Sequence, residues 1–225
     1  MKKTTCGLLA IGILVLVSTS AVVVYLAAND KQRGAPKLVR VACVGDSLTQ
    51  STPYPYDLWL ALGNSNFTLR NFGAGGTTVS LESETPYMNT TVFREALQYK
   101  PNIVIVMLGT NDAQPSLYRY NESFVYNYVE LVEAFKALSN APKIWIVLPP
   151  PIFSNQSGRI DPVYFKQTLI PDIKQAANET DTPIIDVYSA LAGFSNDFPD
   201  GVHPNDSGAS IIADTIYKAI TLRHL

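Results

Sequence analysis

The sequence contains few of the side chains that bind metals or cross-link a chain, with two cysteines and two histidines among 225 residues. Cys6 lies in an apolar N-terminal segment and Cys43 in a strand-like run, so we expect no disulfide within the folded domain. Neither a C-x-x-C nor an H-E-x-x-H spacing is present, and two histidines do not supply a typical zinc site. We therefore predict that the protein binds no metal and uses no cofactor.

Charge of either sign is also sparse. Charged residues make up 16% of the chain, the formal net charge is −2, and the isoelectric point is about 5.7. Nucleic-acid binding requires a basic surface, so we expect no nucleic-acid partner. Internal repeats and low-complexity tracts are missing as well, and a hydrophobic fraction of 47% is typical of a globular protein.

Residues 4–29 contain no charged side chain at all. Residues 7–28 are nearly all apolar, and a helix of that length rises about 33 Å, enough to cross the hydrocarbon core of a bilayer. A cleavable signal peptide usually has a shorter apolar region of roughly 7–15 residues, although cleavage near residues 18–21 remains an alternative. We assign residues 1–36 to a signal anchor or signal peptide with a short linker, and residues 37–225 to one folded domain.

Apolar runs alternate with amphipathic segments along this domain. The predicted strands are 37–44, 67–71, 103–108, 143–148 and 183–187. The predicted helices are 56–62, 92–98, 121–138, one that begins at Asp161-Pro162, and 207–222. Because the strands are continuous apolar runs that alternate with helices, we predict a parallel sheet covered on both faces, with functional residues after the carboxyl ends of strands.

His203 is the starting point for a candidate site, because the other histidine, His224, is the penultimate residue. Asp200 precedes His203 by three residues, with Gly201 between them. A tight turn at glycine brings such a carboxylate to the imidazole Nδ1, which fixes the tautomer and leaves Nε2 to act as a base. A solvated loop histidine is the alternative interpretation.

Ser47 follows the first predicted strand, where a parallel α/β fold places its active site. Its hydroxyl is a candidate nucleophile for a base at His203. The alternative is that Ser47 or Asp46 is a helix N-cap, which is common where a strand leads into a helix.

Four sequence blocks together resemble the SGNH hydrolases, the GDSL esterase/lipase family. The blocks are Gly45-Asp46-Ser47-Leu48, Asn71-x-Gly73-x-x-Gly76, Gly109-Thr110-Asn111-Asp112 and Asp200-x-x-His203-Pro204. They occur in the order and spacing of the family, and they span nearly the whole domain. The resemblance implies an α/β fold, a three-layer α/β/α sandwich with a central parallel sheet (the flavodoxin-like SGNH hydrolase fold).

The resemblance also implies a role for each matching residue. Ser47 is expected to be the nucleophile, His203 the general base and then acid, and Asp200 its orienting partner. The oxyanion donors of the family match the Gly76 backbone N–H and the Asn111 side-chain amide, with the Ser47 N–H as the third. Such donors stabilise the negative charge of a tetrahedral intermediate by roughly 3 kcal/mol each.

Competing motifs are absent. No G-x-S-x-G is present, and the glycines at 73–76 lack the spacing of a dinucleotide-binding loop. Asp46 and Asp112 are expected to brace loops and not to act as catalysts.

We predict a serine esterase that hydrolyses short-chain acyl esters, acetyl first. The later blocks look most similar to carbohydrate O-acetylesterases of the family, including sialate-type ones, so the expected partner is a small-molecule or carbohydrate ester. The loops near the site are too short for a lipase-type lid, and they carry four tyrosines that either stack on a sugar or pack the loops: Tyr54, Tyr56, Tyr118 and Tyr120. The alternatives are an acyltransferase that uses the same triad, a longer-chain lipase or lysophospholipase, a non-catalytic binding protein and a structural membrane protein.

The domain carries six N-x-S/T sequons, more than chance placement of these residue types would give. Because such sequons accept glycans in the secretory pathway, we predict a lumenal or extracellular domain, held at the membrane by the N-terminal segment or secreted if that segment is cleaved. The sequon at Asn205 is expected to stay unmodified, since a glycan two residues from His203 would obstruct the cleft. The predicted glycosylation sites are Asn66, Asn89, Asn121, Asn155 and Asn178.

Overall fold

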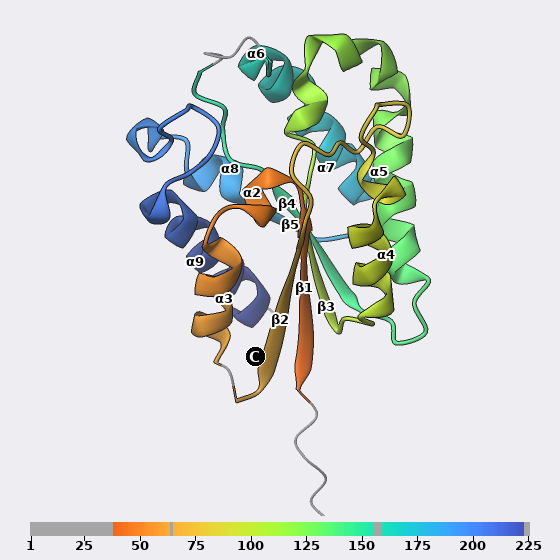
Figure 1. Cartoon of the computed structure of the whole chain (residues 1–225), viewed down its shortest axis with the longest axis vertical. Coiled ribbons are helices and arrows are strands. Elements are labelled where there is room, and N and C mark those ends of the chain that lie inside the picture. The colour runs from red at the N-terminus through yellow and green to blue at the C-terminus, as the bar shows by residue number, and fades with distance from the viewer. Residues whose placement is uncertain (1–37, 64, 155–158, 223–225) are drawn as a thin grey trace, which may run out of the picture. The chain divides into compact units, whose positions relative to one another are not determined.

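The computed structural model describes residues 38–63, 65–154 and 159–222, which are built around a parallel five-stranded sheet (Figure 1). Neighbouring strands all pair in parallel, in the spatial order β2-β1-β3-β4-β5. The strands are β1 Val39–Gly45, β2 Phe67–Gly73, β3 Ile103–Met107, β4 Lys143–Leu148 and β5 Ile184–Asp186. The five predicted strands are confirmed.

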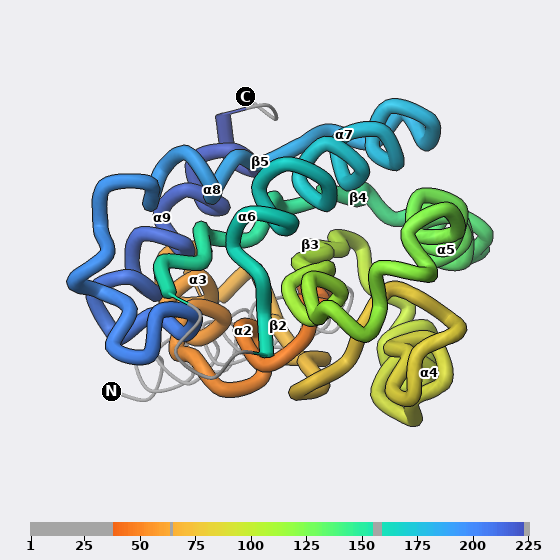
Figure 2. Tube along the Cα trace, turned by 90° about the horizontal axis from the view of Figure 1, so that it is seen from above, coloured from red at the N-terminus to blue at the C-terminus, as the bar shows by residue number. Residues whose placement is uncertain are grey.

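Helices cover both faces of the sheet, because the side chains of the central strands alternate in direction and are apolar on both faces. Ala42 and Val44 point into a core that includes residues of α4, α5 and α7, whereas Val41 and Cys43 point into a core that includes residues of α3 and α9. Figure 2 shows these two groups of helices on opposite sides of the strands. The helices are α3 Tyr54–Leu62, α4 Thr91–Gln98, α5 Asn121–Lys136, α7 Ile170–Glu179 and α9 Asp206–Leu222.

The apolar stripes of the two longest helices are buried as their periodicity predicts. In α5 the buried stripe consists of Phe124, Tyr128, Leu131 and Phe135. In α9 it consists of Ile212, Ile216 and Ile220. These stripes press α5 and α9 against opposite faces of the sheet, and the predicted three-layer sandwich is confirmed.

The helix predicted to begin at Asp161-Pro162 has an interrupted course. The Asp161 carboxylate accepts hydrogen bonds from the N–H groups of Val163 and Tyr164, as expected for an N-cap. The chain then runs through α6 Pro162–Tyr164 and one π-turn, Phe165–Leu169, into α7. Pro171 has no N–H to donate to the preceding turn, which accounts for the change in helical pitch just before it.

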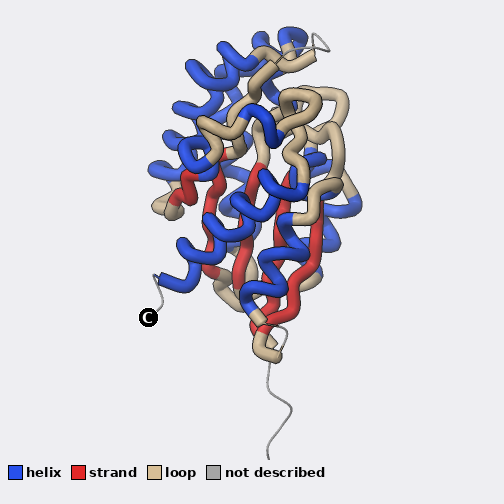
Figure 3. Tube along the Cα trace, turned by 90° about the vertical axis from the view of Figure 1, so that its left-hand side faces the viewer, coloured by secondary structure: helices blue, strands red, loops and turns tan. Residues whose placement is uncertain are grey.

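The remaining short elements lie in the connections of the described residues. They are α2 Ser47–Gln50, α8 Val187–Ala190, and the 3₁₀ turns Tyr87–Asn89, Asn111–Ala113, Pro115–Tyr120 and Ser195–Asp197. Figure 3 shows the loops gathered above one end of the sheet. This is the carboxyl end, where β1 leads into α2.

The strand order places a switch point at this end of the sheet. From β1 the chain crosses to β2 on one side, and the next strand, β3, lies on the other side of β1. Connections that leave adjacent strands in opposite directions open a crevice at the carboxyl ends, here between β1 and β3. The fold therefore directs the residues that follow β1 and β3 to one place.

Within residues 38–63, 65–154 and 159–222, no helix combines the length and the apolar character that a bilayer span requires. The segment 7–28, for which a membrane span was predicted, lies outside the described residues.

Candidate active site

Ser47 is the first residue of α2, directly after the carboxyl end of β1. The Asp46 carboxylate caps this helix by accepting a hydrogen bond of 2.9 Å from the Leu48 N–H. The capping hypothesis is thus correct for Asp46, and it leaves the neighbouring Ser47 hydroxyl free to point elsewhere. Ser47 Oγ lies 2.9 Å from His203 Nε2, across a separation of 156 residues in the chain.

Asp200 and His203 form the tight turn that their spacing predicts. One oxygen of the Asp200 carboxylate accepts hydrogen bonds from the N–H groups of Val202 at 2.9 Å and His203 at 2.7 Å. The other oxygen lies 2.7 Å from His203 Nδ1. Gly201 adopts a φ of +81°, a conformation that favours glycine, so the residue type at this position lets the turn close.

The Asp200 carboxyl group is stabilised in its ionised form by this turn. Burial alone would raise its pKa, but the hydrogen bonds from His203 and Val202 outweigh that effect and lower the pKa to about 2. An ionised Asp200 favours the proton on His203 Nδ1, so His203 Nε2 is left to accept the hydrogen bond of the Ser47 hydroxyl.

Gly76 and Asn111 lie on the loops that follow β2 and β3. A Cβ atom added to Gly75 would stand 3.7 Å from Ser47 Cβ, so this loop passes close to the serine. Gly76 has a φ of +75° and open space where a side chain would be, which leaves its peptide uncovered. One amide hydrogen of Asn111 is donated to the Thr77 carbonyl at 2.9 Å, so the amide keeps a second hydrogen for another acceptor.

Asp112 ties these two loops together, as its predicted bracing role requires. Its carboxylate accepts hydrogen bonds from the N–H of Val79 at 2.9 Å, the N–H of Ser80 at 2.9 Å and the hydroxyl of Ser80 at 2.7 Å. Burial raises the pKa of Asp112, and these hydrogen bonds oppose the rise. The Gly76 loop is therefore held against the residue that follows Asn111.

Asp46 is a second buried carboxylate under the site. Burial raises its pKa to about 7; the Leu48 hydrogen bond lowers it, the charge of Asp112 raises it, and that of His203 lowers it. Its second oxygen is buried and has no hydrogen-bond partner among the described residues. Asp46 braces the start of α2 through its hydrogen bond with Leu48, which is separate from the Ser47–His203 contact.

Two residues that shape the site were not singled out as site residues by the sequence. Gln50 Oε1 accepts a hydrogen bond of 2.9 Å from the Gly75 N–H, which fixes the turn before Gly76. The Asn71 amide donates to the Thr49 carbonyl at 2.7 Å, and its oxygen accepts from the Gly73 N–H at 2.8 Å. Asn71 was visible as the first residue of its sequence block, whereas nothing local marks an exposed glutamine such as Gln50.

The four loop tyrosines have different environments. Of the two alternatives for these tyrosines, packing holds for Tyr54, because its side chain is fully buried and its hydroxyl lies 2.9 Å from Thr49 Oγ1. Tyr56 is exposed on α3. Tyr118 packs its ring on Tyr164, with centroids 3.9 Å apart, and donates its hydroxyl to Asp161. Only Tyr120 of the four lines a pocket together with Gly76.

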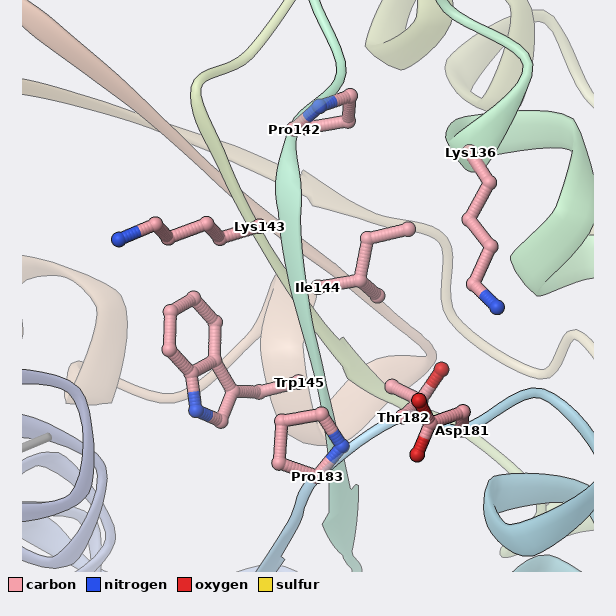
Figure 4. A pocket seen from close by; sticks show the side chains of 8 residues that line it. All are labelled: Lys136, Pro142, Lys143, Ile144, Trp145, Asp181, Thr182 and Pro183. Carbon is pink, nitrogen blue, oxygen red and sulfur yellow. The ribbon is translucent and has the colours of Figure 1, made fainter.

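One cavity lies at the end of the sheet opposite to Ser47. A cavity of about 370 Å³ lies at the amino ends of β4 and β5, where Lys136 and Ile144 project on one side of β4 and Trp145 on the other (Figure 4). Ser47 is at the opposite end of the sheet. Over the described ranges, no three His, Cys, Asp or Glu side chains cluster closely enough to hold a metal ion.

The predicted glycosylation sites differ in accessibility. Asn66, Asn89 and Asn178 are exposed, whereas Asn121 is half-buried and accepts a hydrogen bond from the Tyr164 hydroxyl at 2.8 Å. Asn155 lies outside the described residues. The Asn205 side chain accepts a hydrogen bond of 3.0 Å from the Gly208 N–H at the start of α9, so its amide is already engaged in the fold.

Comparison with known proteins adds independent findings. Residues 43–211 match the model of the GDSL-like lipase/acylhydrolase family, which includes Ser47, Gly76, Asn111, Asp200 and His203 in the matched range. An acetylxylan esterase from Xylanibacter ruminicola is 29% identical over 214 residues, a match that covers 83% of this chain and 44% of that protein. The chain therefore spans less than half the length of this relative.

Solved structures share the fold. A carbohydrate acetylesterase family member from Sinorhizobium meliloti has a TM-score of 0.67 at 22% identity, over 82% of this chain and 98% of that chain. An acetylxylan esterase from Geobacillus stearothermophilus has a TM-score of 0.64 at 20% identity, over 83% of this chain and 95% of that chain. At these identities the likeness concerns the fold.

Proposed function

Because the chain belongs to the GDSL-like lipase/acylhydrolase family, we propose that it is a serine esterase that hydrolyses short-chain acyl esters, acetyl first, on carbohydrates. The observation that carries the proposal is the continuous hydrogen-bonded line from Ser47 Oγ to His203 Nε2, at 2.9 Å, and from His203 Nδ1 to Asp200, at 2.7 Å. These distances are those of a nucleophile, a base and an orienting carboxylate.

The proposed reaction proceeds through an acyl-enzyme. Ser47 Oγ attacks the acyl carbon while its proton passes to His203 Nε2, and collapse of the tetrahedral intermediate breaks the ester C–O bond. His203 then returns the proton to the leaving alcohol oxygen. A water molecule then attacks the acyl-enzyme while His203 Nε2 takes its proton. Collapse of the second intermediate breaks the bond between the acyl carbon and Ser47 Oγ, His203 returns the proton to Ser47 Oγ, and the acid leaves. Asp200 stays ionised throughout and stabilises the imidazolium.

The intermediate carries a negative charge that needs donors. The Ser47 N–H, the Gly76 N–H and the second amide hydrogen of Asn111 are the proposed set. The Asn111–Thr77 hydrogen bond of 2.9 Å and the Asp112 contacts hold this set in place before substrate arrives. Preorganised donors of this kind act without reorganisation during the reaction, which is why each contributes so strongly.

The names of the relatives support the acetyl group and the carbohydrate. An acetylxylan esterase matches in sequence, and a carbohydrate acetylesterase family member and an acetylxylan esterase match in fold. Acyl transfer to another alcohol and hydrolysis of long-chain esters use the same residues. A series of acetyl, butyryl, octanoyl and palmitoyl esters of one alcohol separates these activities, with an added sugar acceptor to reveal transfer. A kcat/KM that rises toward palmitoyl would replace the proposal with a lipase.

Substitution of the proposed nucleophile is the direct test. Ser47→Ala is expected to leave the fold intact and to abolish p-nitrophenyl acetate hydrolysis and labelling by a fluorophosphonate. Ser51→Ala, four residues away and exposed, is the matched control and should retain both. Parent-like turnover in Ser47→Ala would refute the triad.

We also propose an extracellular or lumenal location, on the basis of the charge-free segment 4–29 and the exposed sequon residues Asn66, Asn89 and Asn178. Expression of the full chain in eukaryotic secretory cells, followed by membrane fractionation and enzymatic deglycosylation, tests it. A band that deglycosylation does not shift would count against this location.

A further inference from the structure

A polar pocket of about 380 Å³ lies directly beside the proposed oxyanion residues. Gly75 and Gly76 form part of its wall, and Gln114 forms another part. Gly76 lines the pocket directly, and Gln114 connects it to Asn111 by donating its side-chain amide to the Asn111 carbonyl at 2.9 Å. The volume falls within the roughly 300–1,000 Å³ that is usual for small-molecule sites.

The charged side chains of this pocket balance each other. Glu82 and Glu84 line it from the loop that follows β2, and Arg119 and Arg159 from the segments after β3 and β4. Glu82 is fixed by a hydrogen bond of 3.0 Å from the Asn127 amide. The two carboxylates would repel an anionic ligand. A fatty chain would remove water from the charged groups without forming hydrogen bonds to them, which costs free energy. Hydroxyl groups, which both donate and accept, satisfy carboxylates and guanidinium groups together.

One aromatic ring completes the lining. Tyr120 is half-buried, and the Arg119 guanidinium lies 4.8 Å from the centre of its ring. An aromatic ring among hydrogen-bonding groups suits a pyranose, whose C–H groups need apolar contact while its hydroxyls need polar partners. The arginine fixes the ring in place and so lowers the entropy lost on binding.

We propose that this pocket is a sugar subsite, which holds a neutral monosaccharide unit of the acetylated substrate next to the Ser47 centre. The inference rests on the proposed esterase function and names the part of the molecule that distinguishes a carbohydrate ester from a simple one. Tyr120 contacts the sugar ring, and Glu84 and Arg119 bind its hydroxyls. The ester carbonyl then reaches the Gly76 and Asn111 donors from the adjoining sugar.

The test compares two substrates, an acetylated neutral xylooligosaccharide and p-nitrophenyl acetate, which has no sugar. Tyr120→Ala is expected to lower kcat/KM for the oligosaccharide, relative to kcat/KM for p-nitrophenyl acetate, about tenfold. The main cause should be a higher KM for the oligosaccharide. Glu84→Gln, which preserves the shape of the side chain, should lower the same ratio and covers the case in which Tyr120→Ala does not fold. Tyr126→Ala, an exposed tyrosine on α5, is the matched control and should leave the ratio unchanged.

Failure of the subsite and failure of the esterase proposal give different results. A parent protein that hydrolyses p-nitrophenyl acetate but shows the same ratio as both variants overturns the subsite alone. If the parent hydrolyses neither substrate, the esterase proposal fails, and calorimetric titration with deacetylated xylooligosaccharide still decides the subsite. Binding to the parent that weakens in Tyr120→Ala supports it, and equal binding or none overturns it.

Discussion

Replacement of Asp112 by asparagine should disconnect the two loops that carry the proposed oxyanion donors. Asparagine has the shape of aspartate but offers one oxygen acceptor, where the carboxylate offers two. In the more favourable orientation the amide oxygen keeps the two Ser80 hydrogen bonds of 2.9 and 2.7 Å. The amide NH₂ then faces the Val79 N–H, which at present donates to the carboxylate at 2.9 Å, so that two donors meet.

The magnitude follows from the burial of this contact. Asp112 is 3% exposed, so water does not replace the lost acceptor. A hydrogen bond to a charged acceptor contributes about 1.5–3 kcal/mol, and the unpaired Val79 N–H costs a further 1–3 kcal/mol, roughly. We expect the free energy of unfolding to fall by about 3 kcal/mol, which lowers Tm by about 6–12 °C in a domain of this size. Asn111 directly precedes Asp112, so loosening this loop should displace the Asn111 amide from its proposed position in the oxyanion hole. Because a displaced donor stabilises the intermediate less, kcat should fall by about tenfold or more.

Thermal unfolding followed by circular dichroism at pH 8, together with steady-state hydrolysis of p-nitrophenyl acetate, measures both effects. Asp214→Asn is the control, because Asp214 is exposed on α9 and pairs with Lys218, an i,i+4 contact that contributes about 0.3–0.5 kcal/mol. If Asp112→Asn unfolds at the same temperature as this control and keeps parent activity, the carboxylate does not brace the loops and the reasoning is refuted.

Three further predictions concern the same end of the sheet. Asn111→Ala should lower kcat by roughly 10²–10³ with little change in KM, and an effect on KM alone would make Asn111 a substrate-binding residue. Asp200, with a pKa of about 2, is ionised near neutral pH and stabilises the imidazolium that forms on His203, so Asp200→Asn should lower kcat of p-nitrophenyl acetate hydrolysis with little change in KM, and a parent-like kcat would contradict this role. Burial raises the pKa of Asp46 from 3.8 to about 7, so the folded state keeps a proton that the unfolded chain loses. In urea unfolding, the free energy of unfolding should therefore fall as the pH rises from about 4 to 7. Asp46→Asn should lack this contribution, so an equal pH dependence of the unfolding free energy in the parent and in Asp46→Asn would contradict the shift.

The sequence was most informative where periodicity or covalent spacing determines geometry. β3 is a continuous apolar run and β4 is one after its first residue, and the stripes of α5 and α9 follow helical spacing, so the layers could be predicted. Asp200 and His203 are close in the chain, so their contact needed only a turn at Gly201. The contact between Ser47 and His203 spans 156 residues and could be anticipated only because four blocks resembled a family.

Side chains in irregular segments were harder to place. Tyr54 and Tyr120 look alike in the sequence, yet one is buried against Thr49 and the other lines the polar pocket. The direction of each side chain depends on where α3 begins and on how the 3₁₀ turn Pro115–Tyr120 ends. The spacing of apolar residues in the sequence does not determine either feature. At Ser47 the two interpretations that seemed to compete both hold in geometry, since Asp46 caps the helix while Ser47 faces His203.

The separation of Ser47 from His203 along the chain has a consequence for refolding experiments. Residues 38–154 supply Ser47, Gly76 and Asn111, and residues 159–222 supply Asp200 and His203. Secondary structure and the Asp200–His203 turn can form from neighbours in the chain, but the Ser47–His203 contact requires α9 to dock on the finished sheet. Recovery of ester hydrolysis after denaturation therefore reports when α9 docks and the Ser47–His203 contact forms. It should lag behind the return of helical ellipticity.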